Sequence, residues 1–446
     1  MPMAQGKKMY NPSQRGKTAE RLVLGWTGIW LGCGILAVPY LAAKSEVVSS
    51  DELILALFLP LLILQAHKAF ALGSYRRLWP FMALMGTMVA GLFWTPPSEL
   101  NRGVMRLAYL VVGYVLGRII VGNLNSQSLY RGFLASGIAM GLFLLIRVVM
   151  EGDLRGFVEF DVDGNSILNK NAQAYHFCFL SLVCWAAIRR RPEWFAGTIV
   201  RNAMRAGTLL LPLCVVLSGS RGAFFTGVAL LLLNGWRFLT FGRIAGLLGG
   251  ATVLAAMIQM YSGEDTRTLF TRLSKGDETL YSAGGRVEIW AALPEVIRAN
   301  PRIVLIGGGT GSADYYLGPY VERKKEATDE IVRKHSHSSY LEWVLCHGAL
   351  GCVLALAGMV SLCRGALKYD RRTGGKLGAS LMVFWGMSSF TTVTWMHPFF
   401  VVFFAMLVDV YVRQAFPGRH PDSIFNDDSP ARRARGGVAA GGAVRA

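Results

Sequence analysis

Charged residues are scarce in this chain of 446 residues: they make up 17% of it, whereas hydrophobic residues make up 53%. The mean hydropathy is correspondingly positive, at +0.39. A soluble protein of this length needs fewer apolar residues to fill its core. The composition therefore excludes an ordinary soluble protein and predicts an all-α polytopic membrane protein.

Runs of roughly 20 apolar residues, enough to cross a hydrocarbon core of about 30 Å, occur along most of the chain. They predict about twelve transmembrane helices. The first run is too long for the apolar part of a cleaved signal peptide, so we expect it to remain as a helix. The approximate spans are 22–43, 53–73, 78–95, 103–122, 130–150, 172–188, 206–218, 222–240, 243–262, 340–363, 376–394 and 397–415.

Acidic residues are also few, at 28 against 46 basic residues, which gives a net charge of +18. The basic residues gather on one side of the predicted spans, as cytoplasmic Lys and Arg do. Both termini are therefore predicted to be cytoplasmic, and no nucleic-acid partner is needed to explain the charge. With that orientation, the short outer loops hold only Lys44, Arg102, Arg155, Lys170 and Arg221.

The spans divide the chain into five predicted parts. A long outer loop separates two groups of helices, and the C-terminal tail, rich in Gly, Ala and Arg, has too few apolar residues to fold alone. The parts are a cytoplasmic segment 1–21, transmembrane helices 1–9 in 22–262, a cap loop 263–339, transmembrane helices 10–12 in 340–415, and a disordered cytoplasmic tail 416–446.

The loop 263–339 is far longer than an ordinary connection. Apolar residues recur at helical spacing between Val287 and Ile297, which predicts a small helical cap over the membrane. Asn300 and Pro301 should end its first helix, and a second should run from Pro319 to about Lys334. The intervening IGGGTGS (306–312) has no preceding strand, so a turn or a tight packing site is favoured over a nucleotide-binding loop.

Cysteine and histidine are rare, with seven of each. All the cysteines fall inside predicted spans, so no structural disulfide is implied. His335 and His337 could supply two ligands to a metal ion, but no third His or Cys lies in the cap. We therefore expect neither a catalytic metal nor another cofactor.

Two of these histidines end the cap loop, in HSHSSYLEWVLCHGALG (335–351). Ser339 and Glu342 fit a capping box, which would start the tenth span at Ser339 and leave His337 two residues before it. The positive end of a helix dipole disfavours imidazolium, so a neutral His337 could act as a general base. Alternatively, His337 only forms a hydrogen bond at the start of the helix. His335 is expected to lie next to His337, one layer further from the reacting atoms.

Arginines near the outer side are the second chemical signal. Arg221, in LSGSRGAFF, lies where Ser220 can cap the eighth span, and a helix N-terminus with a guanidinium is an anion site. The alternative is an arginine that reaches out to lipid phosphates. Arg286 follows two glycines in SAGGRVEIW, whereas Arg147 and Arg106 lie near outer helix ends, where a charge usually lines a cavity. Together they predict a positive pocket for a phosphate or diphosphate.

Four pieces of the chain, within about 165–365, together resemble the O-antigen ligases. That family belongs to a larger group with the O-antigen polymerases and the protein O-oligosaccharyltransferases. The resemblance depends on the order of the pieces as well as their letters. The pieces are LNKNAQAY, SGSRGAFF, GGRVEIWAALPEVIRANPRIVLIGGGTGS and HSHSSYLEWVLCHGALG.

The resemblance implies a metal-independent, inverting glycosyltransferase of the GT-C type in the bacterial inner membrane, with its active site in the periplasm. The implied donor is O-antigen linked to undecaprenyl diphosphate, and the implied acceptor is lipid A-core. His337 would be the base, and Arg221 and Arg286 would neutralise the diphosphate. Candidate substrate-binding residues are Arg147, Asn171, His335 and Ser338.

Ser338 stands where many of these proteins have Asn, so a role for that amide is not expected here. An O-antigen polymerase or a protein O-oligosaccharyltransferase would use the same pocket and remains an alternative. A lipid or solute transporter could also hold an anionic headgroup with outward arginines. Against a transporter, the sequence has no paired internal repeat, no matched broken helices and few acidic residues midway through its spans.

Overall fold

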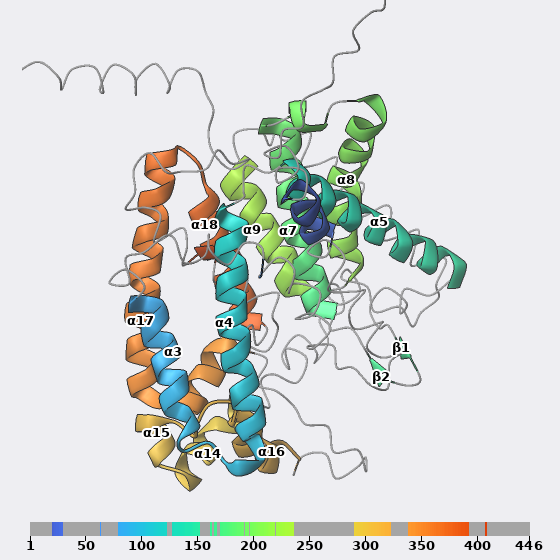
Figure 1. Cartoon of the computed structure of the whole chain (residues 1–446). Coiled ribbons are helices and arrows are strands. Elements are labelled where there is room, and N and C mark those ends of the chain that lie inside the picture. Colours follow the sequence, from blue (N-terminus) through green and yellow to red (C-terminus); the bar gives the residue numbers. More distant parts are fainter. Residues whose placement is uncertain are drawn as a thin grey trace, which may run out of the picture.

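The computed structural model shows a helical protein (Figure 1). Within the described residues, strand is limited to a short antiparallel pair, β1 (Asp161–Val162) and β2 (Asn165–Ser166). The helical class predicted from the sequence is therefore confirmed. The structure describes residues 20–29, 63, 79–122, 127–151, 161–162, 165–166, 170–190, 192–195, 197–218, 220–235, 290–322, 338–391 and 406–407.

Eight helices correspond to predicted membrane spans. Three of them, α5, α8 and α17, are long and apolar enough to cross a membrane. Much of the spans 22–43, 53–73, 243–262 and 397–415 lies outside the described residues, so the count of twelve stays a prediction. The eight are α3 (Trp79–Leu92), α4 (Leu100–Gly122), α5 (Gln127–Glu151), α7 (Lys170–Arg190), α8 (Thr198–Leu217), α9 (Arg221–Gly235), α17 (Ser339–Thr373) and α18 (Leu377–Thr391).

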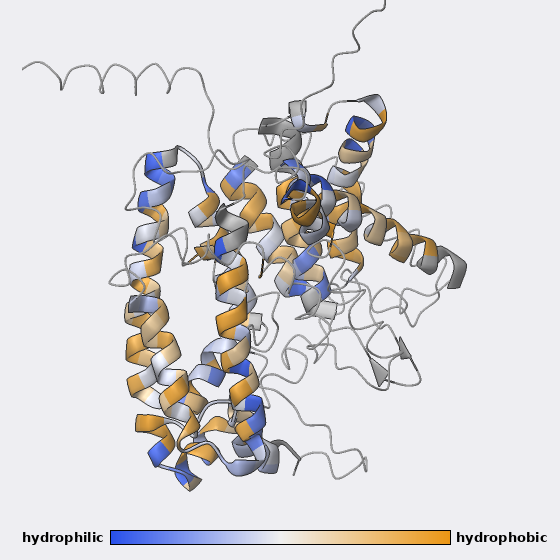
Figure 2. Ribbon diagram, in the orientation of Figure 1, coloured by the Kyte–Doolittle hydropathy of each residue, from blue (hydrophilic) through white to orange (hydrophobic). Residues whose placement is uncertain are grey.

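These helices form two groups joined by α9 and α18 (Figure 1). In one group α3 and α17 pack together with α4, and in the other α7 packs against α5 and α8. Short 3-10 helices, η2 (Pro97–Glu99) and η3 (Pro192–Phe195), precede α4 and α8. Apolar residues cover most of α5 and α9, whereas the end of α17 that leads to α18 is hydrophilic (Figure 2).

Small residues allow close packing in the second group. A Cβ on Gly137 of α5 would lie 2.6 Å from Leu180 of α7. Cys184, late in α7, donates its thiol to the carbonyl oxygen of Met204, early in α8, at 3.4 Å, so these two helices are antiparallel. Interfaces of this kind are typical of helices that pack inside a membrane.

Three short helices of the cap lie at one end of the first group, and their bounds correct one prediction. They are α14 (Leu293–Ala299), α15 (Arg302–Ile306) and α16 (Ala313–Glu322). Asn300 caps α14 as predicted. The predicted start of the next long helix at Pro319 is wrong, because Pro319 lies inside α16. Proline favours the first turn of a helix, but here the Ser312 carbonyl accepts the Tyr316 N–H at 3.3 Å and starts the helix earlier.

The glycine-rich segment between α15 and α16 packs into a break in α17. Gly348 has φ 60° and ψ −164°, which interrupts the helix. The carbonyls of Leu345 and Cys346 instead accept the amides of Gly308 at 2.7 Å and Gly309 at 3.0 Å. Buried carbonyls released by a broken membrane helix need such internal partners. The prediction that IGGGTGS forms a turn or a tight packing site is confirmed.

Candidate active site

The described residues include only part of the predicted site. His335, His337 and Arg286 lie outside them. Arg147 and Asn171 lie on α5 and α7, but their side chains are outside the described part of the structure. Ser338 and Arg221 are described in full, so the site is built here from these two residues and from the helices that lead to the others.

Ser338 is the N-cap of α17. Its backbone is extended, with φ −148° and ψ 122°, and its carbonyl oxygen accepts the N–H of Glu342 at 3.0 Å. The predicted capping box at Ser339 is wrong, because the cap is one residue earlier and makes no side-chain cap hydrogen bond. His337 therefore directly precedes the cap, in the part of the chain that runs into the positive end of the helix.

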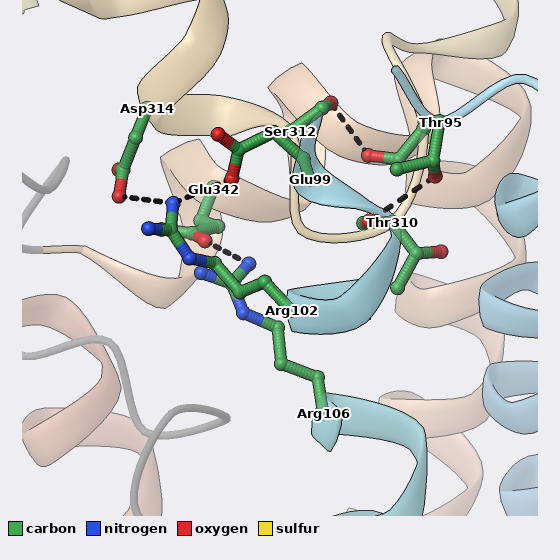
Figure 3. A network of polar contacts seen from close by, with 9 residues as sticks. Thr95, Glu99, Arg102, Arg106, Thr310, Ser312, Asp314 and Glu342 are labelled. Carbon is green, nitrogen blue, oxygen red and sulfur yellow. Dashed lines mark hydrogen bonds and ion pairs between the residues drawn. The ribbon is translucent and has the colours of Figure 1, made fainter. Parts of the chain in front are cut away.

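The carboxylate of Glu342 pairs with Arg106 of α4 (Figure 3). Only 5% of the Arg106 side chain and 4% of the Glu342 side chain are exposed, so the ion pair is buried. A charge-assisted hydrogen bond is about twice as strong as a neutral one, which favours Arg106 as a partner of Glu342. The expectation that Arg106 lines a positive cavity is thus corrected: Glu342 neutralises it.

A second ion pair lies one turn earlier on α4. Arg102 donates to Asp314 of α16 at 2.9 Å and lies 2.7 Å from Glu99 (Figure 3). Unlike Arg106, it is partly exposed, at 27% of its side chain. Arg102 therefore ties α16 to the start of α4, while Arg106 ties α17 to the same helix.

Threonine hydroxyls fix the glycine-rich segment beside these pairs (Figure 3). Thr95 donates to the carbonyl oxygen of Gly91 at 2.8 Å and lies 3.1 Å from that of Thr310. Thr310 donates to the carbonyl oxygen of Met88 at 2.6 Å. The turn from α3 to α4, the glycine-rich segment between α15 and α16, and the start of α17 therefore form one polar assembly.

Arg221 begins α9, and Ser220 caps that helix as predicted, because its hydroxyl accepts the Ala223 N–H at 3.4 Å. Since α8 is antiparallel to α7 and turns directly into α9, helices α7 and α9 are parallel. A Cβ on Gly227 of α9 would lie 3.4 Å from the sulfur of Cys178 on α7. Six positions earlier on each helix, Arg221 comes level with the backbone of Ala172, the residue that follows Asn171.

Gln173 is a residue that the sequence analysis missed. It lies on α7, two positions after Asn171, and is 1% exposed. Neither its amide nitrogen nor its carbonyl oxygen has a hydrogen-bond partner among the described residues. Its position in LNKNAQAY was the available signal, because a glutamine in the first turn of an apolar span must satisfy two polar groups.

Helix α18 connects all four sequence pieces. Tyr340, from the histidine-bearing piece, donates its hydroxyl to the carbonyl oxygen of Gly386 at 2.9 Å. Tyr175, from LNKNAQAY, contacts Phe384 with ring centroids 6.0 Å apart, and Trp290, four residues after Arg286, contacts Phe390 at 6.1 Å. The fourth piece forms α9, which packs on α18. Segments far apart in the chain thus converge on one helix.

Three of the four pieces also lie in a segment that matches a known family. Residues 206–356 match the family model described as O-antigen ligase. The matched segment belongs to the O-antigen ligase family. The predicted resemblance is thereby confirmed. A comparison with curated proteins finds no match.

The match supports a membrane-integral protein that transfers glycans, of the O-antigen ligase and polymerase kind. The matched family implies lipid-linked glycan substrates in general. The matched segment contains Arg221, Arg286, His335, His337 and Ser338 but ends before α18. The helix on which the pieces converge therefore lies outside the family match.

A metal site is not formed by the described part of the chain, where no three His, Cys, Asp or Glu side chains could hold an ion together. The two histidines of HSHSS lie outside that part. Metal-independent chemistry therefore stays a prediction.

Proposed function

We propose that this protein is an O-antigen ligase. It transfers O-antigen from undecaprenyl diphosphate to lipid A-core on the periplasmic side of the bacterial inner membrane. The observation that carries the proposal is the O-antigen ligase family match, which includes both Arg221 and His337. The convergence of Tyr175, Trp290 and Tyr340 on α18 supports it, because each lies within five residues of a proposed site residue.

The proposed topology has twelve membrane helices, a periplasmic cap and a GT-C architecture. Helices α14 to α16 lie at the same end as the α3–α4 turn and the start of α17 (Figure 1). The opposite end of α17 carries Arg364, Lys368, Arg371 and Arg372. This distribution of basic residues supports a cytoplasmic position for the latter end and a periplasmic position for the cap.

The proposed reaction is a direct displacement. His337 takes the proton from a sugar hydroxyl of the acceptor, the oxygen attacks the anomeric carbon, and the lipid diphosphate leaves with its electron pair. The position of His337 before the N-terminus of α17 favours a neutral imidazole, which a base requires. Arg221 and Arg286 stabilise the charge that develops on the leaving diphosphate.

The remaining proposed contacts lie around this centre. Arg147 and Asn171 bind the donor near its headgroup, and His335 and Ser338 support the acceptor side of His337. Asn171 is included because Ala172, the residue that follows it on α7, is level with Arg221 of α9. Inversion at the anomeric carbon is expected, and retention in the product would contradict the displacement.

Purified protein and its His337→Ala variant test the proposal. Each is given lipid-linked O-antigen and lipid A-core with a chelator present, and glycan-bearing lipid A is followed on a gel. Transfer by the parent alone supports a metal-independent ligase that needs His337. If the parent instead lengthens the glycan on undecaprenyl diphosphate, the protein is a polymerase; if it glycosylates an added acceptor protein, it is a protein O-oligosaccharyltransferase. An unaffected His337→Ala variant would contradict the base.

A further inference from the structure

The first nine residues of α17 are held on three sides. Glu342 pairs with Arg106 of α4, Tyr340 donates to Gly386 of α18, and the carbonyls of Leu345 and Cys346 accept amides of the glycine-rich segment. The break at Gly348 separates this short section from the rest of the helix. Its orientation is therefore set by these contacts and not by the long helix that follows.

We propose that Arg106 and Glu342 are positioning residues for His337. The inference rests on the proposed function, in which His337 is the base. The pair fixes the first turn of α17, and that turn fixes the segment with the histidine. Neither side chain needs to touch the substrate for this role.

The geometry gives a short path from the ion pair to the histidine. The N–H of Glu342 bonds to the carbonyl of Ser338, so the two residues are locked across one helical turn. Ser338 is itself buried, and His337 is joined to it by one peptide unit, with Cα atoms about 3.8 Å apart. A shift of Glu342 therefore acts directly on Ser338, the residue that is covalently joined to His337.

A role in binding the diphosphate fits this pair poorly. Both side chains are almost completely buried, and the guanidinium already donates to a carboxylate. That carboxylate would repel an anionic ligand. Arg102, by contrast, anchors α16 from the same face of α4 and is partly exposed, so it offers a matched control that leaves the first turn of α17 in place.

The test compares the parent with Glu342→Gln, Arg106→Lys and the control Arg102→Met. Steady-state transfer gives kcat and the KM for the lipid-linked donor. Amide hydrogen exchange of peptides covering 335–345 reports the local order of the segment without any reference to activity. A displaced catalytic group typically costs up to about 10²-fold in rate.

For Glu342→Gln we expect kcat to fall about 10²-fold, the donor KM to change little, and exchange in 335–345 to accelerate. Arg106→Lys keeps the positive charge and serves as the second variant in case Glu342→Gln does not fold. It should show a smaller fall in kcat. Arg102→Met should leave the exchange of 335–345 unchanged. Faster exchange with unchanged kcat, or a raised donor KM with unchanged kcat, would each overturn the positioning role.

Failure of the proposed function gives a different pattern. In that case His337→Ala retains transfer, whichever acceptor the protein uses, and the proposed base is wrong. A positioning role for the pair then falls with it, even if exchange in 335–345 still depends on Glu342. If His337→Ala is inactive but Glu342→Gln is fully active, only the positioning inference is lost.

Discussion

The two helix groups are held together by different forces. Between α5, α7 and α8 the contacts are mainly apolar, with glycine and cysteine against Leu180 and its neighbours. Between α4, α16 and α17 they include one buried ion pair, one partly exposed ion pair and backbone hydrogen bonds. Apolar packing in a bilayer tolerates small sliding, whereas directional polar bonds fix an orientation. The directional contacts of the described residues are therefore concentrated beside the segment that carries His337.

The largest effect is expected from Gly348→Val, at the centre of the polar group. The backbone there adopts a conformation that only glycine accepts readily, and a Cβ would lie 2.6 Å from the amide nitrogen of Gly307. We expect destabilisation by about 3 kcal/mol or more, measured as loss of the monodisperse peak in size-exclusion chromatography. Gly358→Ala, on the same helix with neighbours no closer than 3.5 Å, should behave like the parent.

The next test separates catalysis from stability at α9, which packs on α7 of the apolar group. Under the proposed function, Arg221→Gln at the start of α9 should lower the transfer rate by about 10²–10³-fold, because it removes the positive charge that stabilises the leaving diphosphate. The thermal unfolding temperature should not change. Arg205→Gln, on the exposed face of α8, controls for loss of a positive charge. A lower unfolding temperature with normal transfer would show that Arg221 is structural.

Thr310→Val tests one directional bond of the polar group at nearly constant volume. Its hydroxyl donates to the carbonyl oxygen of Met88 at 2.6 Å in a buried position. The expected loss is about 1 kcal/mol of stability, seen as a small fall in the unfolding temperature in detergent. No change would mean that the backbone contacts of the glycine-rich segment suffice.

The smallest effect should come from Gly207→Ala, in the apolar group. The new Cβ would lie 2.6 Å from Cδ1 of Ile138, the mobile end of a side chain. The gain in helix propensity of about 1 kcal/mol should roughly offset the packing cost, leaving the unfolding temperature almost unchanged. Gly132→Ala gives the contrast, because its Cβ would meet the backbone oxygen of Gly25 at 2.2 Å. Equal changes in unfolding temperature for Gly207→Ala and Gly132→Ala would contradict the distinction between contact with the end of a side chain and contact with the backbone.

Local features of the fold could be predicted from the sequence. The bounds of α3 and α4, the cap at Ser220 and the end of α14 at Asn300 each depend on nearby residues. The partner of Glu342 could not be predicted, because Arg106 is 236 positions away and the local pattern fits a capping box equally well. The break at Gly348 was missed for a related reason. Glycine is common in membrane helices, and only the approach of Gly307 to Gly348 makes this one bend.

The candidate site divides in the same way, into features visible in the local sequence and features that depend on packing between distant helices. The histidine, the arginines and LNKNAQAY were recognised as short strings of residues. The role of α18 was not, because Phe384 and Trp385 read as ordinary apolar residues of a span. Their contacts with Tyr175 and Tyr340 exist only after the helices have packed. Gln173 was visible in its motif, but its burial was not.

The break in α17 also constrains how the protein is made. Residues 339–372 are apolar enough to enter the bilayer as one continuous helix. The amides that replace its missing hydrogen bonds belong to Gly308 and Gly309, which leave the ribosome earlier, and the threonine contacts of that segment require α3, which is earlier still. During synthesis from the N-terminus, the groups that satisfy the broken section of α17 are therefore made before α17 itself.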